Sequence, residues 1–232
     1  MEGIITMDFN KRQQAFLYLG RDKFDFYGTG FGNVLTFPFS QITIRDLEIL
    51  NDVQLQTEIE QFIQQYNVPA ENITLIFAPT VLFEKDIVTT SITEDTQKFL
   101  DSVPFENILS NTIPIENGVR VFAANKSFYE ILQTTFSKNG SIIETVIPYF
   151  VFGQDYPMLD SLDAQTASNI LKRIDGLKKL TMIQPKSDQP QTQDSSEVKN
   201  NPNKKQAKIR LYGMVGLFSL LLLILGVMLF NQ

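Results

Sequence analysis

The stretch FLYLGRDKFDFYGTG, from Phe16 to Gly30, has residue types and spacing that could hold a phosphate. Two short apolar runs flank a Gly20-Arg21-Asp22 turn, and backbone N–H groups in a glycine turn can cradle a phosphate group. An ATP-binding β-hairpin has this layout, and so does a hairpin with a purely structural role. The choice between these interpretations decides whether the sequence predicts an enzyme or a scaffold.

A second glycine-rich stretch, YGTGFG, places Gly28, Gly30 and Gly32 in a pattern close to a dinucleotide-binding loop. In the G-x-G-x-x-G fingerprint the third glycine comes one residue later and a helix begins directly after it. Neither condition is met here, and no Walker A motif occurs elsewhere. The sequence therefore favours a flexible hairpin tip over cofactor binding.

Carboxylate pairs are the remaining candidates for acid and base chemistry, because the chain has no cysteine and no histidine. The absence of both residue types excludes thiolate nucleophiles, Ser-His-Asp triads, disulfides and the usual zinc sites. The pairs are Asp22 with Asp25, Glu94 with Asp95, and Asp160 with Asp163. None stands at a strand end in a recognisable arrangement, so surface charge is the favoured interpretation. We predict no catalytic residue, no cofactor-binding residue and no metal ligand.

The chain has 232 residues, 43% of them hydrophobic, enough for one ordinary domain plus an appendage. Its 20 basic and 26 acidic residues give a formal net charge of −6, which argues against a nucleic-acid-binding surface.

The segment from Leu211 to Phe230 is uncharged over about 20 residues, long enough at ~1.5 Å per residue to span the ~30 Å core of a bilayer. It predicts a single transmembrane helix, which would be the contact with the lipid bilayer. Four basic residues stand just before it, Lys204, Lys205, Lys208 and Arg210, and only Asn231 and Gln232 follow. The positive-inside rule therefore predicts that the N-terminal part lies in the cytoplasm.

Residues 184–203, QPKSDQPQTQDSSEVKNNPN, have the composition of a disordered tether. We therefore expect a flexible N-terminus over residues 1–12, a folded domain over 13–183, a linker with a basic end over 184–210, and the membrane span over 211–230.

Strand and helix periodicities alternate within the expected domain. Residues 15–19, 23–27 and 34–37 predict a three-stranded meander, and helical spacing of apolar residues from Leu55 to Tyr66 predicts an amphipathic helix. The apolar run TLIFA predicts a buried strand that ends before Pro79. TEDTQKFLDSV predicts a short helix capped by Thr93, and residues 119–123, 127–138 and 142–150 predict a strand, a helix and a strand. This order predicts a mixed α/β domain.

Two sections carry a family resemblance. Residues 44–87, IRDLEILNDVQLQTEIEQFIQQYNVPAENITLIFAPTVLFEKDI, resemble the actin-like proteins PilM and GspL of type IV pilus and type II secretion systems. Residues 119–150, VRVFAANKSFYEILQTTFSKNGSIIETVIPYF, are similar to the next unit of that family. The resemblance implies a partial actin-like (ribonuclease H-like) α/β domain with an inserted small subdomain. It also implies a cytoplasmic platform on the bacterial inner membrane, where family members recruit protein partners.

Alignment on that family's phosphate hairpin places Tyr18 where an acidic residue would hold the metal-bound water, and Phe24 or Asp25 near the position of a lysine. The second phosphate hairpin, expected after residue 153, is not found in QDYPMLDSLDAQTASNILKRIDGLKKL. From these departures we expect no bound nucleotide.

We therefore expect a non-catalytic, single-pass platform or adaptor, not an enzyme, with protein partners in a membrane assembly. The helix from Val53 to Tyr66 and an exposed edge strand are the candidate contact surfaces. Two alternatives stay open: a nucleotide-binding actin-like ATPase completed by a partner chain, and a structural membrane anchor unrelated to pili.

Overall fold

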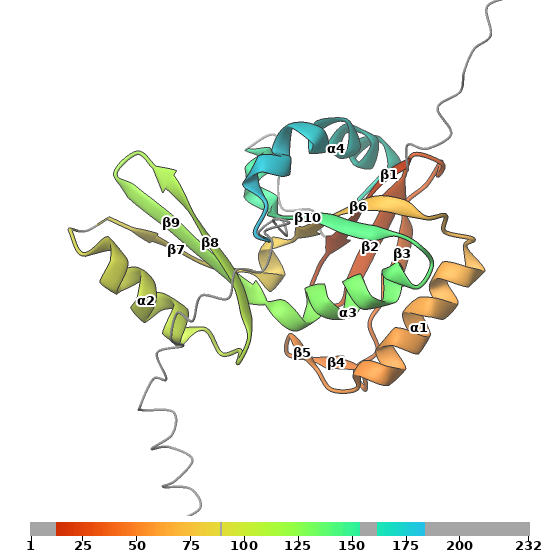
Figure 1. The fold of residues 1–232 in the computed structure, drawn as a ribbon, viewed down its shortest axis with the longest axis horizontal. Helices are drawn as coiled ribbons and strands as arrows, with labels where there is room; N and C mark the ends of the chain where they lie inside the picture. The colour runs from red at the N-terminus through yellow and green to blue at the C-terminus, as the bar shows by residue number, and fades with distance from the viewer. Residues whose placement is uncertain (1–12, 89, 154–161, 184–232) are drawn as a thin grey trace, which may run out of the picture. The chain divides into compact units, whose positions relative to one another are not determined.

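The computed structural model describes residues 13–88, 90–153 and 162–183. The predicted N-terminal segment (1–12), linker (184–210) and membrane span (211–230) lie outside these residues. In the part of the chain that is described, no helix is both long and apolar enough to cross a membrane. The described residues belong to one structural unit with alternating strands and helices, so the predicted mixed α/β class is confirmed (Figure 1).

A five-stranded sheet in the order β10-β6-β1-β2-β3 forms the centre of the domain. The predicted meander is present as β1 (Gln13–Leu19), β2 (Lys23–Gly28) and β3 (Leu35–Pro38), in which β2 runs antiparallel to both β1 and β3. β6 (Glu71–Phe77) and β10 (Ile142–Pro148) continue the sheet parallel to β1. The run TLIFA in β6 is apolar at nearly every position because helices cover both faces of the sheet.

Two helices that lie side by side, α1 (Asp52–Gln65) and α3 (Lys126–Ser137), cover one face of this sheet (Figure 1). Asn51 caps α1 by accepting a hydrogen bond from the Gln54 N–H, and the buried positions of α1 follow the predicted periodicity. Phenylalanine rings from the sheet and both helices pack together between them, namely Phe24, Phe26, Phe37, Phe62 and Phe136.

The opposite face packs against α4 (Ala164–Leu177). Asp163 caps this helix by accepting a hydrogen bond from the Thr166 N–H at 2.8 Å. The buried side chains of the helix, Ala167, Ile170 and Ile174, meet Phe16, Ile76 and Ile147 of the sheet. The central sheet is therefore the middle of three layers.

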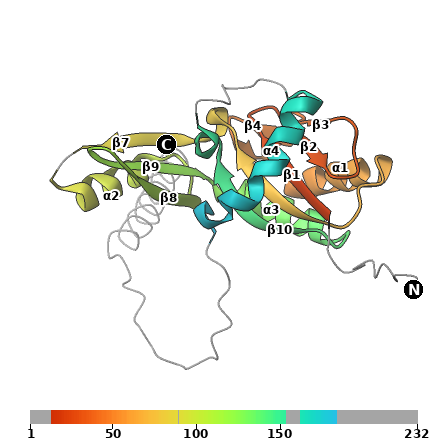
Figure 2. The ribbon, with the colours of Figure 1, turned by 90° about the horizontal axis from the view of Figure 1, so that it is seen from above.

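A small subdomain is inserted between β6 and α3, as the family resemblance implied. It contains a 3₁₀ turn, η1 (Pro79–Val81), then β7 (Phe83–Ile87), α2 (Ile92–Ser102), β8 (Ile108–Ile115) and β9 (Gly118–Asn125). Its three strands form an antiparallel sheet in the order β7-β9-β8, which Figure 2 shows beside the main sheet.

Short elements join these parts. β4 (Ile44–Arg45) and β5 (Glu48–Ile49) form a tight hairpin through Asp46 and Leu47, both at positive φ. The Asn125 side chain donates a hydrogen bond to the Leu47 carbonyl at 2.9 Å and caps α3, so the hairpin is tied to the junction of β9 with α3. After β10 come the 3₁₀ turns η2 (Tyr149–Phe152) and, beyond α4, η3 (Lys178–Leu180).

Three details of the sequence-based elements are wrong. Thr93 lies inside α2 and does not cap it, because the helix already begins at Ile92. The last predicted strand, to Phe150, ends at Pro148, since residues 149–152 turn into η2 ahead of Gly153 at positive φ. β7 and β8 were not predicted at all, because their exposed positions are charged or polar and Pro114 interrupts the run.

Candidate functional site

A pocket of about 370 Å³ opens at the turn between β1 and β2, where the sequence predicts a phosphate-binding hairpin. The turn is closed by the Gly20 N–H, which donates to the Lys23 carbonyl at 2.9 Å. Ala78, Pro79 and Thr80, which follow β6, form the facing wall. β1 and β6 are parallel and end here, at the edge where sheets of this class commonly bind ligands.

Asp25 is the buried carboxylate of this pocket, with 1% of its surface exposed. It lies directly opposite Tyr18 in the β1–β2 ladder and opposite Thr36 in the β2–β3 ladder. Directly opposed residues point to the same face of a sheet, so the three side chains lie together. The structure thus places Tyr18 at the predicted hairpin position and brings a carboxylate to it from the neighbouring strand.

The carboxylate of Asp25 is already bound within the fold. The Thr36 hydroxyl donates to Oδ1 at 2.6 Å, and Nζ of Lys23 lies 3.0 Å from Oδ2. Removing one partner of a buried ion pair costs roughly 3–5 kcal/mol; the cost is lower here because the Lys23 side chain is 29% exposed. A phosphate that recruited Lys23 would therefore have to overcome the loss of this contact.

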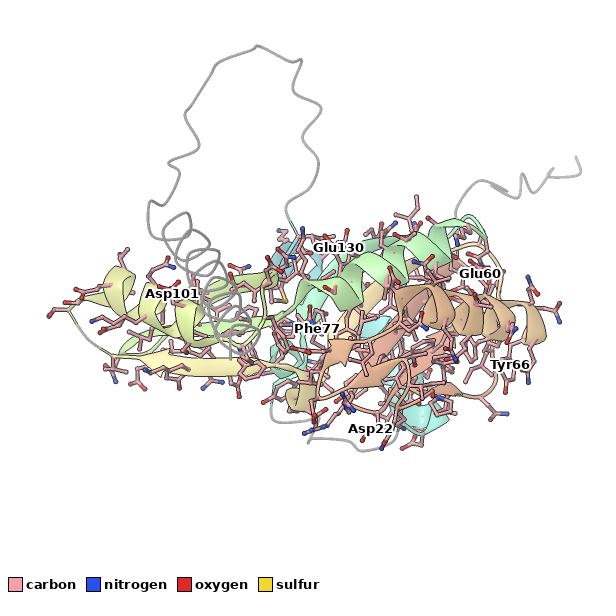
Figure 3. The ribbon with its side chains drawn as sticks, turned by 90° about the horizontal axis from the view of Figure 1, so that it is seen from below. Asp22, Glu60, Tyr66, Phe77, Asp101 and Glu130 are labelled. Carbon is pink, nitrogen blue, oxygen red and sulfur yellow. The ribbon has the colours of Figure 1, made fainter. Side chains whose placement is uncertain are left out.

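The other two charges at the turn lie on the surface. Arg21 forms an ion pair with Asp46 of the β4–β5 turn at 3.1 Å, with both side chains exposed. Asp22 projects from the turn (Figure 3), and its carbonyl accepts a hydrogen bond from the Phe39 N–H at 2.8 Å. Two cations and two carboxylates line the pocket, so it has no net charge to attract a polyphosphate.

The remaining predicted pairs occupy surface positions. Glu94 and Asp95 lie on α2 and both contact Nζ of Lys98, at 2.8 Å and 3.5 Å. Asp163 is the cap of α4, and Asp160 lies outside the described residues. The structure does not bring Glu94, Asp95 or Asp163 to the hairpin pocket. Across the described ranges, no group of three acidic side chains could hold a metal ion.

The three glycines of YGTGFG lie at the end of β2 and in the connection to β3. Gly32 has open space around it, whereas a Cβ at Gly28 would lie 2.6 Å from Oε2 of Glu71. Position 28 therefore needs glycine because a buried carboxyl group occupies the space of a side chain.

Glu71 itself is a site that sequence reasoning missed. The residue is fully buried, and neither carboxyl oxygen has a hydrogen-bond partner among the described residues. Burial raises the pKa of Glu71 from 4.5 to about 7. The sequence signal was weak, because Glu71 precedes the apolar run that predicts the strand and reads as a loop residue.

The pairing of Lys23 with Asp25 was missed as well, although alternation in a strand puts these two residues on one face. The contact between Thr36 and Asp25 could not be predicted from the sequence, because it depends on the register of β3 against β2. The site thus consists of Asp25 with its two partners beside the Tyr18 side chain, and the pocket that they line is large enough for a small ligand.

No family model matches the chain, and no curated protein matches it. Solved structures do match. The PilM-PilN type IV pilus biogenesis complex superposes with a TM-score of 0.41 and 11% identity, over 58% of this chain and 47% of that one.

Two further structures belong to the same group of neighbours. The cytoplasmic domain of EpsL, an inner-membrane component of the type II secretion system of Vibrio cholerae, has a TM-score of 0.34 and 10% identity, over 59% of this chain and 57% of that one. A Bacteroides thetaiotaomicron protein with an actin-like ATPase fold and unknown function has a TM-score of 0.33 and 12% identity, over 63% and 55%. The chain thus spans about half the length of these structures. The similarity to PilM and to a type II secretion component, stated from sequence, recurs among them.

Proposed function

We propose that this domain is a non-catalytic actin-like module that serves as a membrane-anchored cytoplasmic platform and works by binding protein partners. The observation that carries the proposal is the Asp25 site, where Lys23 and Thr36 already bind the carboxylate. Tyr18 stands where an ATP-binding hairpin needs a carboxylate for the metal. The platform role follows from the sequence resemblance to PilM and GspL, and the anchor follows from the predicted span at Leu211–Phe230.

Nucleotide binding is the property that separates this proposal from an enzyme. The full chain in detergent micelles is titrated with a fluorescent ATP analogue and Mg²⁺, and we expect no saturable binding at micromolar concentrations. Asp25→Asn is the matched variant, because it removes the charge that holds Lys23 and keeps the size of the side chain. Micromolar binding or ATP turnover by the unaltered chain would refute the non-catalytic role.

Partner binding is tested separately, by cross-linking the full chain in its native membranes and identifying the captured proteins. Components of a pilus or of a secretion system are expected. If the captured complex binds ATP and the chain alone does not, the alternative of an ATPase completed by a partner is correct. If no such component is captured from membranes that contain the chain, it is a structural anchor of another kind.

A further inference from the structure

Within the described ranges, β3 is the last strand on its side of the sheet, and its outer edge has no paired strand. The backbone groups on this edge can accept another strand. The Phe39 N–H donates to the Asp22 carbonyl, so alternation directs the backbone groups of Phe37 and Leu35 toward β2 as well. The N–H and C=O of Thr36 and the C=O of Pro38 therefore point away from the sheet. Pro38 has no N–H, which limits the edge to this short set of groups.

A groove of about 460 Å³ runs along the same edge, between β3 and α1. Phe37 and Phe62 supply apolar surface, and Gln61, Gln65 and Tyr66 of α1 supply the outer wall. Tyr66, at the end of α1, is 39% exposed and labelled in Figure 3. Glu58 is the one charged residue among those that line the groove. An extended segment with an aliphatic side chain directed toward α1 would fit this surface.

The chain itself has such a segment near this edge. The described residues begin at Gln13, the first residue of β1, at the end of the sheet where β3 also begins. The ladders establish this placement, since Ala15 pairs with Gly28 and Phe26 pairs with Leu35. A position outside β3 is three strand spacings from β1, about 14 Å. Leu35 is level with Leu17, four residues or about 13 Å along the sheet from Gln13, so the full distance from the outside of Leu35 to Gln13 is about 19 Å. Seven extended residue steps cover about 23 Å, so residues 7–12 can make the crossing.

The preceding residues have the right composition. Gly3, Ile4, Ile5, Thr6 and Met7 include three β-branched residues in a row, which favour a strand. A chain that descends along β3 and then crosses to the start of β1 runs antiparallel to β3, because β3 and β1 point the same way. The segment therefore has the length, the direction and the residue types that the edge requires.

We propose that residues 3–7 dock on the outer edge of β3 as a sixth, antiparallel strand of the main sheet. In the register that satisfies the edge, Ile5 exchanges two hydrogen bonds with Thr36, and the Gly3 N–H donates to the Pro38 carbonyl. Ile4 is then opposite Phe37 and fills the groove beside Phe62. Ile5 faces the other side of the sheet. The edge predicted as a partner surface is in this arrangement occupied by the chain's own N-terminal segment.

Hydrogen exchange at the Thr36 amide tests the proposal in the full chain in detergent micelles. We expect exchange in the unaltered chain to be slower by about tenfold or more than in Ile4→Asp, whose charge cannot enter the apolar groove. Ile5→Asp is the matched control, with the same charge on the solvent side of the strand, and should keep Thr36 protected. Equal rates in the unaltered chain and Ile4→Asp would overturn the proposal. Protection that rises with protein concentration would also overturn it, since a second copy would then cover the edge.

A disulfide gives an independent test, because the natural chain has no cysteine. Thr6 and Leu35 form a non-hydrogen-bonded pair in the proposed register, with Cα atoms about 4.5 Å apart, which suits a disulfide. Thr6→Cys combined with Leu35→Cys should cross-link within one chain on mild oxidation. Thr6→Cys combined with Glu116→Cys, on the inserted subdomain, should not. A disulfide between chains in the first pair, or none, would overturn the proposal.

Discussion

Glu71 is a buried acidic residue whose charged form is disfavoured by its surroundings. Its carboxyl group is fully buried without a hydrogen-bond partner among the described residues, and burial raises its pKa to about 7. In the unfolded chain the pKa returns to about 4.5. Between these two values the folded state therefore holds a proton that the unfolded state has released, and each rise in pH favours unfolding.

Glu71→Gln should remove this pH dependence. The unaltered chain is expected to lose about 3 kcal/mol of unfolding free energy relative to the variant as pH rises from about 4.5 to about 7. Above that window the difference should stay constant. Denaturant unfolding of both proteins across the pH range measures it. Glu116→Gln, at an exposed turn, is the control and should follow the unaltered chain; a parallel course for Glu71→Gln would contradict the assignment.

Residue-level prediction from sequence reached Tyr18 and the Gly20 turn, because both depend only on local spacing. The contacts of Asp25 were not predicted, because its hydrogen bond with Thr36 depends on the register of β2 against β3. That register cannot be derived from a single sequence. Glu71 was not predicted either, because a charged residue at the start of a strand usually faces solvent.

At the scale of elements, the inserted sheet depends on one close backbone contact. Gly118 begins β9, and a Cβ at this position would lie 2.0 Å from the Ile87 carbonyl oxygen of β7. Backbone atoms cannot move aside as a flexible side chain can. The strands β7 and β9 would have to separate to admit even a methyl group.

Gly118→Ala should therefore weaken the inserted sheet, by about 1–3 kcal/mol, the usual cost of overpacking. Amide exchange in β7 and β9 should accelerate while exchange in β1 and β6 stays slow. Gly32→Ala is the matched control, because no atom lies within 4 Å of the added Cβ. Unchanged exchange in β7 and β9 of Gly118→Ala would show that the contact can relax.

Elements with strong periodicity were predictable, and those without it were not. α1, α3 and β6 have long apolar patterns, so their positions followed from sequence within a few residues. β7 reads FEKDI and β8 reads ILSNTIPI, and most polar residues of both strands are exposed, while α2 packs against β7 and β9. Their strand conformation comes from pairing with β9, which is a non-local contact.

At the scale of the whole molecule, η2 joins the inserted sheet to the main one. Phe150 packs edge-on against Phe122 of β9 with ring centroids 5.1 Å apart, and the Arg120 guanidinium lies 5.6 Å from the Phe150 ring centroid. Arg120 in turn binds Asp86 of β7 through two hydrogen bonds, at 2.6 and 2.8 Å. One aromatic side chain thus contacts the central strand of the insertion.

Phe150→Ala should loosen the insertion without unfolding the main sheet. Truncation of a half-buried phenylalanine is expected to lower the free energy of unfolding by about 2 kcal/mol. We expect the effect to be largest at the contact between η2 and β9. Limited proteolysis of the β8–β9 turn and amide exchange in β9 should both speed up. Tyr149→Phe, which removes only the hydroxyl that lies 3.3 Å from Glu84, should have a small effect. A uniform rise in exchange across both sheets would mean that they unfold together.

The contact of Gly28 with Glu71 has a consequence for sequences that share this fold. Gly28 has no unusual backbone angle, so its side-chain restriction depends entirely on the carboxyl group beside it. A side chain at position 28 would require the Glu71 carboxyl group to move out of the space that it occupies. We therefore expect larger residues at position 28 to occur together with shorter residues at position 71.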